Sequence, residues 1–138
     1  MLTSPETSLS RLRSSNANGV PMIVGIGVDA VDIERFTAAL ERTPGLASRL
    51  FTLGERGLSP ASLAARFAAK EALIKAFGES GSMGWHDVSV VKDEAGKPSF
   101  VLAGEALKMA EAKGITNVQL SLSHDGGMAV AFVVAEGA

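Results

Sequence analysis

The sequence contains no cysteine, and its formal net charge is only −2. The absence of cysteine excludes disulfide bonds, thiolate zinc sites, iron–sulfur clusters and a cysteine nucleophile. No apolar run reaches the roughly 18–20 residues that a membrane-spanning helix requires. Proteins that bind nucleic acids are usually strongly basic, and this chain is not. These absences predict a cytoplasmic protein that binds neither nucleic acid nor a membrane.

The length and composition of the chain are typical of one folded domain. The chain has 138 residues, of which 46% are hydrophobic and 20% are charged, which excludes wholesale disorder. Residues 1–20 are rich in serine, threonine and asparagine, and they show neither a hydrophobic period nor the apolar core of a secretory signal. We therefore expect a flexible N-terminal extension over 1–20 and a single domain over 21–138.

The hydrophobic pattern predicts an α+β domain with a largely antiparallel sheet, because the last four predicted strands are joined in hairpins. The expected strands cover 22–28, 88–92, 99–102, 118–124 and 128–135. The expected helices lie between Asp32 and Thr43, within 46–57, over Pro60–Phe77 and over Ala103–Lys113. Asp32 and Ser59 are suitable N-caps, and Gly78 is a suitable helix stop.

The first predicted strand ends at a carboxylate. Side-chain alternation places Ile23, Gly25, Gly27 and Asp29 on one face of the strand. Two glycines strip that face of side chains. We therefore expect room for something large beside the Asp29 carboxylate.

The predicted helix Pro60–Phe77 carries charges although it is apolar nearly all round. Seven alanines cover most of its surface, so we expect it to pack on more than one side. Arg66, Lys70, Glu71 and Lys75 nevertheless lie on it, and buried charges persist when they are paired or bind a ligand. The simplest interpretation of Glu71 and Lys75 is an ordinary i,i+4 ion pair. The second carboxylate, Asp29, favours a ligand site instead.

Three segments in this order resemble the holo-[acyl-carrier-protein] synthases, which are small 4′-phosphopantetheinyl transferases. They are Ile23-Val-Gly-Ile-Gly-Val-Asp29, Arg66-Phe-Ala-Ala-Lys-Glu-Ala-Leu-Ile-Lys-Ala-Phe-Gly78 and Ser121-Leu-Ser-His124. The hairpin signal Gly96-Lys-Pro98 strengthens the match, which extends from about residue 22 to 136. The resemblance implies a small, mostly antiparallel sheet packed on a long alanine-rich helix. It also implies a homotrimer with active sites shared between neighbouring subunits.

The resemblance implies that the protein transfers 4′-phosphopantetheine from coenzyme A to a serine of apo acyl carrier protein and releases adenosine 3′,5′-bisphosphate. It implies Mg²⁺ as the cofactor, with Asp29 and Glu71 as its ligands. Mg²⁺ favours one or two carboxylates together with phosphate and water oxygens. The proton of the serine goes either to Glu71 or to a water on the metal. Whether the metal is Mg²⁺ or Mn²⁺, and which carrier is physiological, stay open.

The other functional residues are assigned with their alternatives. Lys75 is expected to donate to phosphate oxygens during the reaction, and Lys70 either does the same or anchors a structural carboxylate. The resemblance implies that Arg66, Ser123 and His124 bind the coenzyme A nucleotide, although the strand pattern alone fits a core or strand-end histidine equally well. Lys97 either reaches a phosphate or is a solvated lysine at a hairpin tip.

Four arginines recur at intervals of seven residues, at 35, 42, 49 and 56. The simplest interpretation is that all four are solvated, with Glu34, Glu41 and Glu55 as neighbours. The functional interpretation is a basic surface for an acidic carrier protein, since complementary charge steers encounter. The resemblance assigns carrier binding to Arg35, and we add Arg42. The competing hypotheses are a coenzyme A-binding module without chemistry and a trimeric structural protein.

Overall fold

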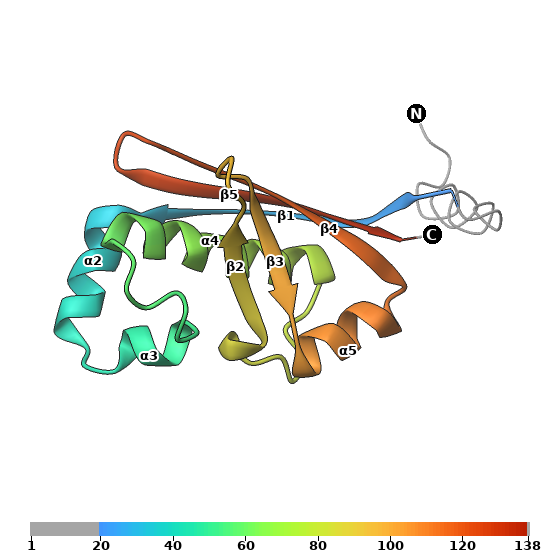
Figure 1. Ribbon diagram of the computed structural model, residues 1–138, viewed down its shortest axis with the longest axis horizontal. Coiled ribbons are helices and arrows are strands. Elements are labelled where there is room, and N and C mark those ends of the chain that lie inside the picture. Colours follow the sequence, from blue (N-terminus) through green and yellow to red (C-terminus); the bar gives the residue numbers. More distant parts are fainter. Residues whose placement is uncertain (1–19, 138) are drawn as a thin grey trace, which may run out of the picture.

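The computed structural model describes residues 20–137, so the expected extension over 1–20 lies, apart from Val20, outside the described residues. The elements are β1 (Met22–Asp32), α2 (Ile33–Arg42), α3 (Leu46–Leu50), α4 (Pro60–Phe77), η1 (Trp85–Asp87), β2 (Val88–Lys92), β3 (Pro98–Leu102), α5 (Gly104–Ala112), β4 (Ile115–Asp125) and β5 (Met128–Gly137) (Figure 1). The prediction of an α+β fold with antiparallel strands is confirmed. The strands form two sheets, one of order β1-β5-β4 and one hairpin β2-β3.

The helix boundaries follow the capping residues. The backbone N–H of Arg35 donates to Asp32 Oδ1 at 2.8 Å and begins α2. The N–H of Ser62 donates to Ser59 Oγ at 3.2 Å and begins α4, with Pro60 as its first residue. At the other end of α4, Gly78 has a φ of 84°, a conformation that glycine adopts without strain.

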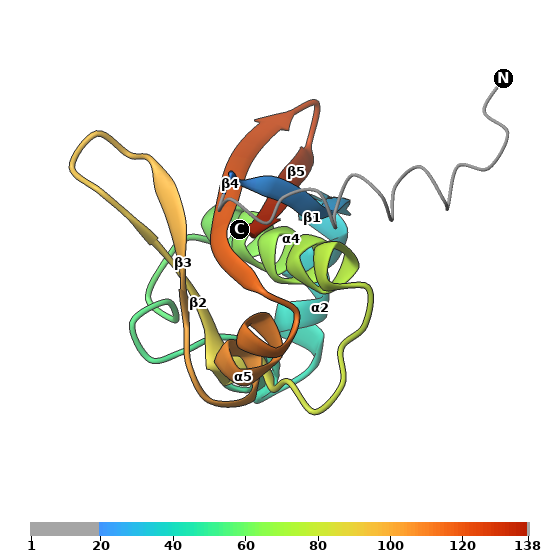
Figure 2. The same ribbon diagram turned by 90° about the vertical axis from the view of Figure 1, so that its right-hand side faces the viewer.

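Helix α4 is the centre of the molecule. It lies directly beneath the three-stranded sheet, and α2, α3, the β2–β3 hairpin and α5 lie on its other sides (Figures 1 and 2). Both hydrophobic clusters include residues of α4. The expectation that this helix packs on more than one side is therefore confirmed. Within residues 20–137, no helix is long and apolar enough to cross a membrane.

Gly25 and Gly27 form the contact between β1 and α4. A Cβ atom at Gly25 would lie 1.9 Å from the carbonyl oxygen of Ala76, and one at Gly27 would lie 1.9 Å from that of Ala72. Because these two residues have no side chain, the backbone of α4 can pack directly against β1. The room that was predicted beside Asp29 is taken up by the backbone of α4. The role of the two glycines is to bring α4 close enough for its side chains to meet Asp29, which follows Gly27 on the same face.

The outer face of the three-stranded sheet is apolar and exposed. A bulge between Ile23 and Gly25 interrupts the alternation of β1, so Ile23 points outward and Val24 packs into the core. The prediction that Ile23 shares a face with Gly25, Gly27 and Asp29 is therefore wrong. Val28 lies opposite Phe132 of β5, and these two side chains are 53% and 44% exposed. No other described element covers this face (Figure 1).

Candidate active site

Asp29 and Glu71 line the same cavity, although they come from different elements. Asp29 is near the end of β1, and Glu71 is in the second half of α4. The cavity has a volume of about 400 Å³, and Arg35 and Arg42 of α2 also line it. The structure thus brings the two predicted metal ligands and the two predicted carrier-binding residues to one place.

The two carboxylates influence each other. Partial burial raises the pKa of Glu71, the negative charge of Asp29 raises it further, and the Lys75 ammonium partly opposes the shift. Glu71 therefore holds a proton more readily than an ordinary glutamate does. A glutamate with a raised pKa is a better proton acceptor than an ordinary glutamate.

Two neighbouring carboxylates are also a suitable set of ligands for a hard divalent cation. Mg²⁺ typically takes one or two protein carboxylates and completes its octahedron with phosphate and water oxygens. A cation between Asp29 and Glu71 would relieve the repulsion that raises the pKa of Glu71. In the described part of the chain, no group of three or more histidine, cysteine, aspartate or glutamate side chains is arranged to hold a metal. The pair therefore fits an ion that receives its other ligands from a substrate and water.

Lys75 contacts Asp29 and not Glu71. Its ammonium donates to Asp29 Oδ1 at 3.2 Å and to the carbonyl oxygen of Val28 at 2.9 Å. The ion pairs found within residues 20–137 do not include one between Glu71 and Lys75. The interpretation of Glu71 and Lys75 as an i,i+4 ion pair is therefore wrong. Lys75 instead pairs with Asp29 and so joins α4 to β1. The Lys75 side chain is 54% exposed, so its ammonium remains accessible to a ligand.

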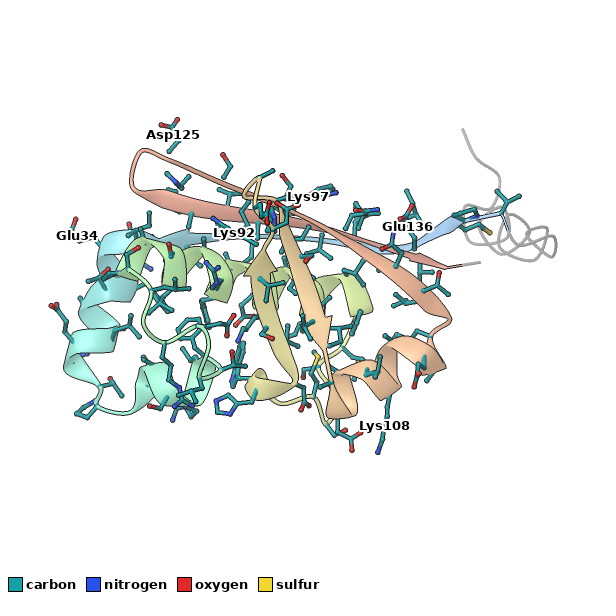
Figure 3. The ribbon with its side chains drawn as sticks, in the orientation of Figure 1. Glu34, Lys92, Lys97, Lys108, Asp125 and Glu136 are labelled. Carbon is teal, nitrogen blue, oxygen red and sulfur yellow. The ribbon has the colours of Figure 1, made fainter. Side chains whose placement is uncertain are left out.

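A second cavity lies beside the first half of α4. Its volume is about 330 Å³. It is lined by Ala61, Ser62, Ala65, Arg66, Lys92, Leu122, Ser123 and His124. Three residues that were assigned to the coenzyme A nucleotide therefore come together there. Lys92, at the end of β2, adds a positive charge that sequence reasoning missed, because only the tertiary fold places β2 beside α4 and β4 (Figure 3).

Arg66 is held in a fixed orientation at this cavity. Its Nε–H donates to the carbonyl oxygen of Val90 at 3.3 Å, and the residue is 6% exposed. Burial lowers the pKa of Arg66, and the negative charge of Glu55 partly opposes that shift. An arginine remains protonated in spite of such a shift. The guanidinium therefore presents a permanent positive charge to the second cavity.

The two cavities face different sides of α4. Arg66 and Glu71 are five residues apart, which corresponds to about 140° around a helix axis. One cavity contains Glu71 and the other contains Arg66, and the residues that line them do not overlap. A ligand group bound at Arg66 therefore does not lie next to Glu71 of the same chain.

Lys70 lines neither of these cavities. Its ammonium donates to Glu55 Oε1 at 2.8 Å, to the carbonyl oxygen of Leu50 at 2.9 Å and to that of Trp85 at 3.3 Å. These three acceptors match the three donors of an ammonium group. Of the two roles considered for Lys70, its contacts are those of an anchor for a structural carboxylate.

Glu55 is a buried charged residue that the sequence indicates only as a neighbour of the arginines. It is 2% exposed. Besides Lys70, its carboxylate accepts hydrogen bonds from the backbone N–H groups of Thr52 and Val90. Burial alone would raise the pKa of Glu55, but the hydrogen bonds from Lys70, Val90 and Thr52 outweigh burial and lower it. Glu55 thereby joins the loop after α3 to α4 and β2.

Two further residues lie apart from the cavities. Lys97 is at the tip of the β2–β3 hairpin, where its backbone N–H donates to Asp93 Oδ1 at 2.8 Å (Figure 3). It is not among the residues that line either cavity. Arg56 donates to the carbonyl oxygens of Phe51 and Ser48, so its guanidinium braces the chain around α3.

Comparisons with known proteins agree with this arrangement. The family model of the 4′-phosphopantetheinyl transferase superfamily matches residues 25–132. A holo-[acyl-carrier-protein] synthase of Clavibacter michiganensis subsp. michiganensis is 60% identical over 116 residues, which are 84% of this chain and 98% of that protein. The crystal structure of the holo-[acyl-carrier-protein] synthase of Neisseria meningitidis superposes with a TM-score of 0.75 at 38% identity, covering 83% of this chain and 98% of that one. A Chronobacterium ammoniagenes ACPS–CoA complex gives a TM-score of 0.70 at 32% identity, covering 83% and 97%.

Proposed function

The chain belongs to the 4′-phosphopantetheinyl transferase superfamily, and we propose that it catalyses the transfer of 4′-phosphopantetheine from coenzyme A to a serine of an apo acyl carrier protein. The observation that carries this proposal is the cavity shared by Asp29 and Glu71. The contact of Gly25 and Gly27 with α4 accounts for the meeting of these two carboxylates. A protein that only bound coenzyme A would not require such a pair.

We assign Mg²⁺ to Asp29 and Glu71. When bound, the ion supplies positive charge that offsets the negative charge of the coenzyme A pyrophosphate. In the reaction, the serine hydroxyl attacks the β-phosphorus and adenosine 3′,5′-bisphosphate leaves. Because this is phosphoryl-type transfer, the protein contributes mainly positioning and charge stabilisation.

Glu71 is our assignment for the group that receives the proton of the serine. It lines the cavity that the serine of a carrier docked on α2 would enter. Lys75 is our assignment for the donor that stabilises the negative charge moving onto the leaving group. Its exposed ammonium at the edge of the carboxylate pair supports this role.

We assign the second cavity to the adenosine and phosphate groups of coenzyme A. Arg66, Lys92 and His124 offer positive or hydrogen-bonding groups there, with Ser123 beside them. Because this cavity and the carboxylate pair face different sides of α4, one coenzyme A molecule would contact Arg66 of one subunit and Glu71 of the next. The proposed homotrimer provides such shared sites.

The outer face of the three-stranded sheet supports self-association. It carries the exposed side chains of Ile23, Ile26, Val28 and Phe132. A contiguous apolar surface of this kind typically marks a protein interface. We propose that this face is buried between subunits of the homotrimer.

Carrier docking is assigned to α2. Arg35 and Arg42 line the cavity that contains Asp29 and Glu71, so a carrier held there would present its serine to the carboxylate pair. Complementary charge between these arginines and an acidic carrier would speed encounter. The cytoplasmic location expected from the sequence stays a prediction.

The direct test is to incubate the protein with coenzyme A, Mg²⁺ and an apo acyl carrier protein and to measure the intact mass of the carrier. We expect a gain of one phosphopantetheinyl group per carrier, and no gain when the carrier serine is replaced by alanine. If the protein binds coenzyme A but the carrier mass never changes, the protein is a binding module and the proposed activity is wrong.

A further inference from the structure

Lys75 is exposed enough to reach a phosphate, but its ammonium has other partners in the structure. A lysine that donates to a substrate phosphate must have its ammonium directed at that phosphate. In the structure, the ammonium lies 3.2 Å from Asp29 Oδ1 and 2.9 Å from the Val28 carbonyl oxygen. It therefore holds one of the two carboxylates that are assigned to the metal.

We propose that Lys75 exchanges between Asp29 and the phosphates of coenzyme A, and that this exchange couples coenzyme A binding to metal binding. The inference rests on the proposed function, since it takes Asp29 and Glu71 as the metal ligands. Without coenzyme A, Lys75 competes with the divalent ion for Asp29. With coenzyme A, the ammonium transfers to the phosphates and Asp29 becomes available.

The contacts of Lys75 allow this exchange. The pair with Asp29 is largely exposed on the lysine side, and exposed ion pairs are weak enough to open readily. Lys70 on the same helix provides the contrast, because it is 1% exposed and has a complete set of three acceptors. Of the two lysines, Lys75 is thus free to change partner and Lys70 is not.

The charges make the exchange directional. Asp29 and Glu71 carry two negative charges when both are ionised, and the Lys75 ammonium neutralises part of them. A divalent ion that approaches the two carboxylates must compete with the Lys75 ammonium for Asp29, and the positive charge of the ammonium repels it. A pyrophosphate offers the ammonium several negatively charged oxygens. Binding free energies are reciprocal, so coenzyme A must strengthen metal binding by the same factor as the metal strengthens coenzyme A binding.

The test measures Mn²⁺ binding, with free Mn²⁺ followed by its electron paramagnetic resonance signal. Titrations are made with and without saturating coenzyme A, and a titration of coenzyme A alone corrects for Mn²⁺ bound by its phosphates. The variants are Lys75→Met and Lys75→Gln, with Lys108→Met as the control, because Lys108 is an exposed lysine of α5 outside both cavities. Circular dichroism confirms that each variant is folded.

Without coenzyme A, we expect Lys75→Met and Lys75→Gln to bind Mn²⁺ about fivefold more tightly than the wild type, as expected for removal of an exposed competing ion pair. With coenzyme A, we expect the variants and the wild type to agree within about twofold. The factor by which coenzyme A strengthens Mn²⁺ binding should thus fall about fivefold. Lys108→Met should behave as the wild type in both titrations.

Two results would overturn the exchange while leaving the proposed function intact. One is unchanged Mn²⁺ affinity in both Lys75 variants. The other is an equal gain with and without coenzyme A, which would mean that Lys75 only repels the ion through space. A third result, in which Asp29→Asn does not weaken Mn²⁺ binding, would overturn the metal site and the exchange together.

Discussion

The contact between Gly27 and α4 predicts that Gly27→Ala damages both stability and activity. The new Cβ atom would lie 1.9 Å from the carbonyl oxygen of Ala72 and 2.8 Å from the backbone nitrogen of Ala76. Both atoms belong to the helix backbone, so no side chain can rotate away. Restoring an ordinary contact of 3.4 Å requires β1 and α4 to separate by about 1.5 Å.

This separation would act on Asp29 and Glu71, because one is on β1 and the other is on α4. A misplacement of about 1 Å can cost about a hundredfold in rate. Overpacking of this kind typically costs about 1–3 kcal/mol in the free energy of unfolding. We therefore expect Gly27→Ala to lower the free energy of unfolding, measured in urea, by about 2 kcal/mol. We also expect it to lower kcat/KM for carrier modification by about a hundredfold.

Gly54→Ala is the matched control. A Cβ atom at Gly54 would meet nothing within 4 Å, and Gly54 is not among the glycines with positive φ. We expect its stability to stay within about 0.5 kcal/mol of the wild type, as for other surface substitutions. If Gly27→Ala behaved like Gly54→Ala in both assays, the proposed reason for the two glycines would be refuted.

The remaining predictions concern the carrier surface, the buried ion pair and the sheet face. Arg35→Glu should raise the KM for the carrier while coenzyme A affinity stays unchanged, and the effect should shrink at high salt; a loss of coenzyme A affinity in calorimetry would contradict the docking role. Glu55→Gln should cost about 3 kcal/mol in urea unfolding at pH 7, because it leaves the Lys70 ammonium buried without its partner. Because folding lowers the pKa of Glu55 from 4.5, the ionised carboxylate stabilises the folded state above pH 4.5, and this stabilisation is lost as the pH falls through the folded-state pKa. The free energies of unfolding of the variant and the wild type should therefore converge at low pH. A difference that stays constant as the pH is lowered would contradict the assigned cause. Phe132→Asp should yield monomers in light scattering and lose transfer activity, and a fully active monomer would refute the shared site.

The sequence was sufficient to predict the features that depend on local spacing. The caps at Asp32 and Ser59 and the stop at Gly78 follow from residues within one turn of each helix end. Asp29 and Glu71 were singled out by a strand with two glycines and by charges on an otherwise apolar helix. Each of these signals lies within a few residues of chain, so it can be read without knowledge of the tertiary fold.

The features that sequence reasoning missed all depend on contacts between distant segments. The glycine face of β1 predicts room for something large, but the sequence does not show that the backbone of α4 at Ala72 fills that space. The partner of Glu55 is Lys70, fifteen residues away on another element. Lys92 reaches the second cavity only because the β2–β3 hairpin folds beside α4.

The central claim is that Asp29 and Glu71 act as a unit, and a double-mutant cycle on the transfer rate tests it most directly. Asp29→Asn and Glu71→Gln should each lower kcat/KM by at least about a hundredfold. If both carboxylates serve one ion, the double variant should be hardly slower than the worse single variant, because the first substitution already removes the site. If the two losses instead multiplied in the double variant, or if either single variant modified the carrier at the normal rate, the two carboxylates would have independent roles and the assigned metal site would be wrong.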